Sequence, residues 1–310
     1  AELLYIPLSA AIACQSFGYD LNDSEGSRLF KEITKLPEYY LTRTEMEILK
    51  NNKKQICGKI GNKEFNLIDL GCGDGKKTGV LLQELQKNDC NFCFFPIDIS
   101  EDAIAEFTDN LKNEFLDLQI RGLVSEYFEG LSWLSSKNNK RNVVLFLGSN
   151  IGNFNPIKTK SFLSSLWKSL NNGDRVLIGF DLKKNIDLMT KAYNDKQGIT
   201  AAFNKNLLKR INSELKGNFD LNQFEFHATY DKDEGAVKSF LVSKKKQKVF
   251  IRGLNKFFTF KKREPIHTES SYKYHFEGIK EMADKNNFEI VENFFDTNNY
   301  FVDSLWKVVK

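Results

Sequence analysis

The chain contains 310 residues, of which 41% are hydrophobic, so it is long enough for one large domain or two modest ones with a sizeable core. Its 45 basic and 41 acidic residues leave a formal net charge of only +4, which gives no reason to expect a nucleic-acid partner. No apolar stretch approaches the roughly 20 residues of a membrane-spanning helix, and residues 6–13 lack the basic flank of a signal peptide. We therefore expect a cytoplasmic protein that does not associate with membranes.

The few histidines and cysteines argue against a metal site. The chain has three histidines, His227, His267 and His275, which are far apart in the sequence. Its single C-x-x-C pair, Cys90 with Cys93, has no second pair to complete a zinc site. We expect no metal ion, and we expect the five scattered cysteines to remain thiols.

The N-terminal segment has the pattern of two helices. An apolar helical pattern ends at Pro37, and Thr44 with Glu47 three residues later predicts the start of a second helix through a capping box. The adjacent tyrosines Tyr39 and Tyr40 lie between the two helices. They either pack half-buried or line a pocket.

A glycine-rich turn follows the first predicted strand, residues 65–70. Gly71, Gly73 and Gly75 stand at alternate positions after this strand and precede a run of helix formers. Glycines at such a turn allow unusual backbone angles and a close ligand approach. The dinucleotide fingerprint G-x-G-x-x-G fails at Lys76, and the spacing of a phosphate-binding loop is also absent. The remaining pattern, D-x-G-x-G-x-G, resembles the first motif of the Rossmann-like S-adenosylmethionine methyltransferases.

Strands and helices alternate after the turn, which predicts a doubly wound parallel sheet. Further strands are predicted at 92–98, 118–123, 143–147 and 175–180, and helices at 76–85, 101–113 and 162–170, the second of them capped by Ser100.

The pattern changes after residue 181. Two helices, 185–193 and 199–215, precede short strands at 224–230, 237–243, 248–251 and 257–260. Because no helix separates these strands, they predict an antiparallel sheet in a second unit. A helix over 276–286 and a hairpin of 288–295 with 300–308 then close the chain.

These elements predict an α/β fold of two discontinuous domains. A Rossmann-like methyltransferase domain would comprise residues 53–183 and 275–310, with the final hairpin at the edge of its sheet. A second α+β domain, which binds the substrate, would comprise the N-terminal helices (1–52) and the insertion (184–274).

Several side chains follow predicted strands and are candidates for ligand binding. Asp98 either hydrogen-bonds ribose hydroxyls or caps the next helix, and Lys77 either neutralises a cofactor carboxylate or lies in solvent. Glu126 and Tyr127 follow the third strand, where an aromatic ring either stacks on adenine or packs in the core. Residues 148–153 follow the fourth strand and face the transferred group.

Longer stretches make the resemblance more specific. Leu-Pro-Glu-Tyr-Tyr (36–40), Pro-Ile-Asp-Ile-Ser (96–100), LGSNIGNF (147–154), AYN with GITAAFN (192–204) and TESSYKY (268–274) stand in the order found in one family. The chain resembles the histidine-specific S-adenosylmethionine methyltransferases of the ergothioneine pathway, which make hercynine from L-histidine.

This resemblance implies a set of substrate-binding residues. Tyr39 or Tyr40 would reach the amino acid, and we favour Tyr40. Asn153 and Tyr193 would hold its α-carboxylate, Gly148 would contact its amine through the backbone, and Glu269 with Ser271 would bind the imidazole. Of these, Tyr40, Asn153 and Tyr193 are the predicted catalytic residues. Taken alone, Tyr193 also fits simple packing on a helix face.

The resemblance also implies S-adenosyl-L-methionine as cofactor. The predicted cofactor contacts are Gly71, Gly73, Gly75, Lys77, Asp98, Glu126 and Tyr127. The family further implies a small-molecule amino-acid substrate and a monomer.

Two positions depart from the family pattern. Glu126 stands where aspartate is common, and Ser239 stands where a methionine lies beside the imidazole. Two alternatives to an L-histidine Nα-methyltransferase therefore stay open. One is a related enzyme that methylates another amino acid, such as an aromatic one, and the other is a cofactor-binding protein without catalysis.

Overall fold

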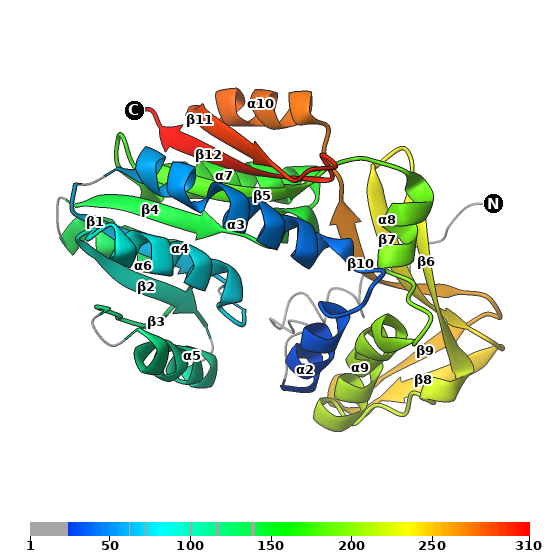
Figure 1. Cartoon of the computed structure of the whole chain (residues 1–310). Coiled ribbons are helices and arrows are strands. Elements are labelled where there is room, and N and C mark those ends of the chain that lie inside the picture. Colours follow the sequence, from blue (N-terminus) through cyan, green and yellow to red (C-terminus); the bar gives the residue numbers. More distant parts are fainter. Residues whose placement is uncertain (1–23, 62, 72, 100, 116–117, 138–139) are drawn as a thin grey trace. The chain divides into compact units, whose positions relative to one another are not determined.

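The computed structural model describes residues 24–61, 63–71, 73–99, 101–115, 118–137 and 140–310. The chain divides into two compact units (Figure 1). Unit 1 comprises the described residues up to Tyr40 together with Lys184–Ser271, and unit 2 comprises Leu41–Lys183 together with Tyr272–Lys310. The expected cap Ser100 and residues 6–13 lie outside the described residues. The assignment of two domains by role stays a prediction.

Unit 2 is built on a seven-stranded mixed sheet in the order β11-β12-β5-β4-β1-β2-β3. Its strands are β1 (Phe65–Leu70), β2 (Phe92–Asp98), β3 (Leu123–Val124), β4 (Arg141–Phe146), β5 (Arg175–Asp181), β11 (Phe288–Phe295) and β12 (Phe301–Val308). The first five are parallel, and β12 and β11 add antiparallel strands beyond β5. The predicted hairpin at the sheet edge is confirmed.

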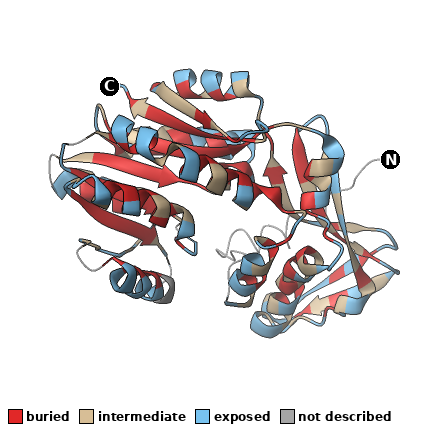
Figure 2. Cartoon of the chain, in the orientation of Figure 1, coloured by how far each residue is buried: buried red, intermediate tan, exposed pale blue. Residues whose placement is uncertain are grey.

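Helices cover both faces of this sheet, because its strands carry apolar side chains on both faces. Alternate residues of β1 serve different cores: Leu67 packs with α3, α4 and α5, and Ile68 packs with α6, α7 and α10. Figure 2 shows the strands buried and the outer helix faces exposed. The helices are α3 (Tyr40–Ile60), α4 (Lys76–Lys87), α5 (Glu101–Glu114), α6 (Tyr127–Lys137), α7 (Pro156–Ser169) and α10 (Phe276–Lys285).

The third strand is shorter than predicted. Instead of a strand over 118–123, only Leu123–Val124 pairs with β2, after an isolated bridge between Ile120 and Phe94. Gly122 lies where a Cβ would overlap Ile104 of α5, so this segment is shaped by helix packing rather than by regular pairing.

Two helices differ from the sequence expectation. Helix α6 was not predicted, and α7 begins at Pro156 instead of at residue 162. The start of α7 has clear local causes: the Asn155 side chain accepts a hydrogen bond from the Lys158 amide at 2.9 Å, and proline occupies the first helical position.

The predicted capping box at Thr44 is wrong. Helix α3 already begins at Tyr40, and the Thr44 hydroxyl donates to the Leu41 carbonyl within the helix. The Glu47 carboxylate instead accepts hydrogen bonds from the backbone amide and the hydroxyl of Thr297. Glu47 therefore fastens α3 to the turn between β11 and β12.

Unit 1 combines helices with two small sheets. The helices are α2 (Ser24–Ile33), α8 (Ile186–Ala192) and α9 (Ile199–Glu214), and the strands are β6 (Phe224–Asp231), β7 (Ala236–Ser243), β8 (Gln247–Ile251), β9 (Lys256–Phe260) and β10 (Pro265–Tyr272), whose last residue belongs to unit 2. Leu208 and Ile211 of α9 share one core with Phe224 of β6, Leu241 of β7 and Phe260 of β9.

The strands of unit 1 form two sheets instead of the single sheet that was predicted. β10, β7 and β6 form one sheet, and β8 pairs with β9 in a separate hairpin. Strand β10 was not predicted, although it carries the TESSYKY motif. Five polar residues in succession, His-Thr-Glu-Ser-Ser, follow Ile266, so an apolar alternation of period two is absent there.

A buried ion pair holds the end of the TESSYKY segment within unit 2. Lys273 Nζ lies 2.7 Å from Asp181 Oδ2, and neither side chain is exposed. The adjacent Tyr274 donates its hydroxyl hydrogen to the Ile151 carbonyl and packs edge-on against Phe180. The segment after β10 is thereby fixed to the end of β5. Among the described residues no helix is both long and apolar enough to cross a membrane.

Breaking this pair is expected to destabilise the protein strongly. Lys273→Met would leave the Asp181 carboxylate buried without its counter-charge, which costs about 3–5 kcal/mol in the free energy of unfolding measured with urea. Removing both charges in a Lys273→Met, Asp181→Leu variant should recover much of that loss. Lys285→Met, which removes an exposed pair with Glu281, serves as the control and should leave stability unchanged. If Lys273→Met were as stable as the Lys285→Met control, the buried ion pair would not have the role given to it here.

Candidate active site

The glycine-rich turn has the backbone that its sequence predicts. Gly71, Gly73 and Gly75 all adopt positive φ, at 75°, 58° and 70°. These angles are strained for residues that carry a Cβ, and a Cβ at position 75 would also overlap the Phe107 ring. The turn therefore exposes backbone at the carboxyl end of β1, where a ligand can approach closely.

The other predicted cofactor residues lie at the same edge of the sheet. Asp98 ends β2 and pairs in register with Val124, and its carbonyl accepts from the Ser125 amide at 3.0 Å. Tyr127 starts α6, and its hydroxyl lies 3.0 Å from where a Cβ of residue 71 would be. The structure thus brings Asp98, Glu126, Tyr127 and the turn together. This edge offers bare backbone, a carboxylate and a phenol, which suit the amino-acid, ribose and adenine parts of S-adenosylmethionine.

Lys77 contacts a residue that the sequence did not single out. Its ammonium lies 2.5 Å from Glu45 Oε2, and the other Glu45 oxygen accepts from the Gly148 amide at 2.6 Å. Gly148 has φ of 82°, and a Cβ there would lie 3.1 Å from Lys77 Nζ. Glu45, Lys77 and Gly148 therefore form one contiguous group. Glu45 was missed because α3 carries many charged residues, so nothing in the sequence marks this one as buried.

Two further buried acids lie at this edge. Burial raises the pKa of Asp69 to about 6, although the Thr78 hydroxyl donates to its carboxylate at 2.5 Å. Burial, together with the nearby Glu45 charge, raises the pKa of Asp303 well above its usual range. Neither Asp303 oxygen makes a hydrogen bond of ordinary geometry with the described residues.

The loop after β4 forms a short 3₁₀ helix, Asn150–Asn153. Ser149 precedes it in the left-handed region, and its hydroxyl accepts from the Asp181 amide at 3.2 Å. Asn153, the predicted carboxylate ligand, ends it with an exposed side chain. Asn150 was not predicted as a site residue, yet its amide group lies near the Cβ positions of both Gly71 and Gly148. It joins the two glycine turns.

The remaining predicted residues belong to unit 1, where several are in contact. The Tyr193 hydroxyl lies 2.7 Å from Ser271 Oγ, and the Tyr193 ring packs edge-on against Tyr39 with centroids 6.0 Å apart. Tyr40 accepts a hydrogen bond from Lys184 Nζ at 2.8 Å. All three tyrosines and Ser271 are buried.

Glu269 and Ser271 stand two positions apart on β10, so their side chains project from the same face of the strand. The neighbouring Thr268 hydroxyl lies 3.0 Å from the Ser239 carbonyl and 2.5 Å from Asn204 Oδ1. Ser239 itself is buried, and its hydroxyl has no hydrogen-bond partner among the residues described.

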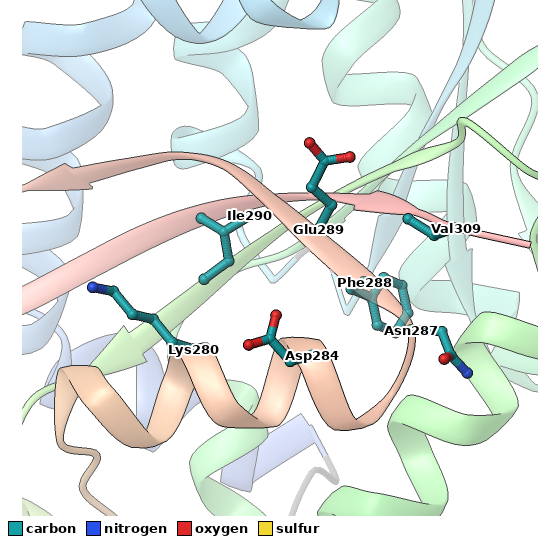
Figure 3. A pocket seen from close by; sticks show the side chains of 7 residues that line it. All are labelled: Lys280, Asp284, Asn287, Phe288, Glu289, Ile290 and Val309. Atoms are coloured by element: carbon teal, nitrogen blue, oxygen red, sulfur yellow. The ribbon is translucent and has the colours of Figure 1, made fainter.

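A surface hollow elsewhere in unit 2 contains none of the predicted residues. It lies beside α10 and the start of β11, as Figure 3 shows, and its lining includes Lys280, Asp284 and Phe288. Phe288 pairs with Val308 and Arg175 pairs with Lys307, so this hollow is at the amino end of the parallel strands. The candidate residues of unit 2 are at the opposite, carboxyl end.

The raised pKa of Asp69 predicts a pH-dependent stability. Asp69 has a higher pKa in the folded protein than in the unfolded chain, so folding is favoured while this carboxyl is protonated. Its contribution to the free energy of unfolding is therefore complete below pH 3.8 and is lost as the pH rises to about 6. Relative to Asp69→Asn, the wild-type protein should lose about 3 kcal/mol of unfolding free energy across that window, since each pKa unit is worth about 1.4 kcal/mol. Urea unfolding of both proteins from pH 4 to 7 measures this. A difference that is constant with pH would contradict it.

Known proteins resemble this chain over most of its length. A family described as histidine-specific, SAM-dependent methyltransferases matches residues 14–308. Histidine N-alpha-methyltransferase of Mycolicibacterium smegmatis is 35% identical over 257 residues, which cover 83% of this chain and 79% of that protein. Ergothioneine biosynthesis protein 1 of Schizosaccharomyces pombe is 33% identical over 307 residues, which cover 96% of this chain but only 40% of that protein.

A more distant relative acts on a different substrate according to its name. The 4-dimethylallyltryptophan N-methyltransferase easF of Claviceps purpurea is 28% identical over 179 residues, which cover 55% of this chain and 52% of that protein. The family match, however, spans nearly the whole chain, and the glycine-rich turn and mixed seven-stranded sheet suit the same cofactor. The chain therefore belongs to the histidine-specific, S-adenosylmethionine-dependent methyltransferases and has their α/β methyltransferase fold.

Proposed function

We propose that this protein transfers three methyl groups to the α-amino nitrogen of L-histidine, which yields hercynine for ergothioneine synthesis. One observation carries the proposal: β10 presents a carboxylate, Glu269, and a buried hydroxyl, Ser271, on one face of one strand. The relative from M. smegmatis, named for histidine Nα-methylation, supports the same acceptor.

This pair matches the chemistry of an imidazole ring. A carboxylate only accepts hydrogen bonds, so Glu269 suits the ring N–H. A hydroxyl both donates and accepts, so Ser271 can pair with the second ring nitrogen in either tautomer. Tyr193 fixes Ser271 through their 2.7 Å hydrogen bond, and Tyr39 packs against Tyr193. A side chain without ring nitrogens would offer these polar groups no hydrogen-bonding atom, which costs binding.

Orientation accounts for most of the catalysis in this scheme. The bound S-adenosylmethionine supplies an electrophilic methyl group, so the protein needs no nucleophile of its own. Tyr40, Asn153 and Tyr193 hold the amino acid so that its neutral amine points along the line of transfer, and such alignment can lower a barrier by up to about 7–11 kcal/mol. The amine loses a proton before each transfer, to water or to a tyrosine phenol.

Aromatic rings also suit the quaternary ammonium product. A cation over a tyrosine face is attracted by the ring quadrupole. In this structure Lys184 Nζ lies 4.4 Å from the centroid of the Tyr40 ring. A methylated ammonium bound against Tyr40 would have to take the place of that lysine.

A second candidate function is Nα-methylation of an aromatic amino acid. Ser239 favours it, because this buried hydroxyl stands where the family has methionine and lacks a hydrogen-bond partner within the described part of the chain. The relative named for 4-dimethylallyltryptophan shows that such acceptors occur among similar proteins.

An acceptor panel separates the two functions. The protein is incubated with isotopically labelled S-adenosylmethionine and each of the twenty amino acids in turn, and labelled products are identified by mass spectrometry. We expect histidine to be methylated far above the others and to accumulate a trimethylated product. Methylation of tryptophan, tyrosine or phenylalanine above histidine would establish the second function instead.

The Glu269 carboxylate should matter for imidazole substrates in particular. Glu269→Ala is expected to lower kcat/KM for histidine by about 10- to 100-fold, because hydrogen bonds to charged groups are worth about 1.5–3 kcal/mol. Glu264→Ala makes the same change just before β10 and serves as the control, which should retain full activity. Equal losses in the two variants would argue against imidazole recognition by Glu269.

A further inference from the structure

Glu45 joins two segments that the proposed function uses separately. Its carboxylate has no solvent exposure, and each of its oxygens has a different partner. One oxygen meets the Lys77 ammonium at the start of α4, and the other accepts from the Gly148 amide after β4. A single buried charge thus fixes both the lysine assigned to the methyl donor and the glycine assigned to the acceptor.

The surroundings of Glu45 are shaped around this carboxylate. Position 179 of β5 is glycine, and a Cβ there would overlap Glu45 Oε1. The charged groups that face Glu45 are Lys77 from α4, Asp303 from β12 and Asp69 from β1. Lys77 is the cation among these groups, and it forms an ion pair with Glu45. An ionised carboxylate is costly to bury, and this one is compensated by strong, charge-assisted hydrogen bonds.

We propose that Glu45 is a positioning residue for cofactor binding, which acts by holding the Lys77 ammonium and the Gly148 backbone in place. This inference rests on the roles that the proposed function gives to those two residues. Lys77 uses one of its three N–H donors on Glu45, and its side chain is 23% exposed, so the others can meet the anionic carboxylate of a ligand.

Gly148 contributes the complementary group. Its amide N–H donates to Glu45, which leaves its carbonyl as the group for a ligand. A carbonyl oxygen accepts from an amine N–H, and this matches the predicted contact between Gly148 and the α-amino group. Glu45 therefore positions two groups: the Lys77 ammonium, which can donate to an anion, and the Gly148 carbonyl, which can accept from an amine.

Titration of S-adenosylhomocysteine, without any amino acid, tests the effect on the cofactor. Glu45→Gln keeps the shape and removes the charge, and we expect its dissociation constant to rise about tenfold, the equivalent of about 1.4 kcal/mol. Glu84→Gln is the matched control, because Glu84 is also buried and lies near a lysine, Lys53, at 3.5 Å. The control should bind as the wild-type protein does.

A double-variant cycle distinguishes positioning from a general structural effect. If Glu45 acts through Lys77, Glu45→Gln should cause no further loss of affinity in a Lys77→Met background. If either single variant unfolds, the double variant, which leaves neither charge unpaired, is compared with the wild-type protein. It should then bind S-adenosylhomocysteine about tenfold more weakly, and an unchanged affinity would overturn the proposal. An unchanged affinity in Glu45→Gln, an equal loss in Glu84→Gln, or an additive loss in the double variant would overturn the proposal. Because no acceptor is present, failure to methylate histidine would leave this test unaffected.

Discussion

Buried carboxylates at the carboxyl edge of the unit 2 sheet are cut off from water, and this constraint determines much of the candidate site. Glu45 must pair with Lys77, and Asp181 must pair with Lys273, because an isolated buried charge is very costly. Each pair joins segments that are far apart in the sequence. The first fixes the start of α4 and the loop after β4, and the second fixes the segment after β10 to β5.

The candidate residues are divided between the two units in a way that matches their chemistry. The residues expected to meet the methyl donor lie in unit 2, where open glycine backbone and strand ends form the edge of a parallel sheet. Glu269 and Ser271, the proposed ligands of the imidazole, lie in unit 1 with Tyr193 and Tyr39. Tyr193 hydrogen-bonds to Ser271 and packs against Tyr39. Rigid support of this kind is what catalysis by orientation requires, since small displacements of the reacting groups reduce the rate steeply.

Much of unit 2 is predictable from sequence because its signals are local. The glycines of the turn need positive φ, and β1 and β2 are short apolar runs whose predicted bounds match the structure. Long-range features were not predictable in this way. Glu45 reads as one charge among many on α3, and its burial follows from α4, β4 and β5 meeting around it. The role of Lys273 is likewise invisible until β5 places Asp181 beside it.

For the TESSYKY motif, the site residues were predicted but the strand that carries them was not. Its resemblance to a family identified Glu269 and Ser271, but its strand was missed because Ser and Thr replace the expected apolar residues. The structure supplies a physical reason for the end of the motif, where Lys273 and Tyr274 anchor the chain. It also draws attention to Ser239, the main departure from the family pattern. Its backbone carbonyl accepts a hydrogen bond from Thr268, and its buried hydroxyl has no partner among the described residues.

The central claim is that this chain selects its acceptor by the nitrogens of an imidazole ring. Calorimetric titration of L-histidine and of L-phenylalanine into the protein saturated with S-adenosylhomocysteine tests it directly, since phenylalanine has an aromatic ring without those nitrogens. We predict that histidine binds at least about 100-fold more tightly, because the phenylalanine ring offers no hydrogen-bonding atom to Glu269 and Ser271 on β10. Equal affinities, or tighter binding of phenylalanine, would contradict the account.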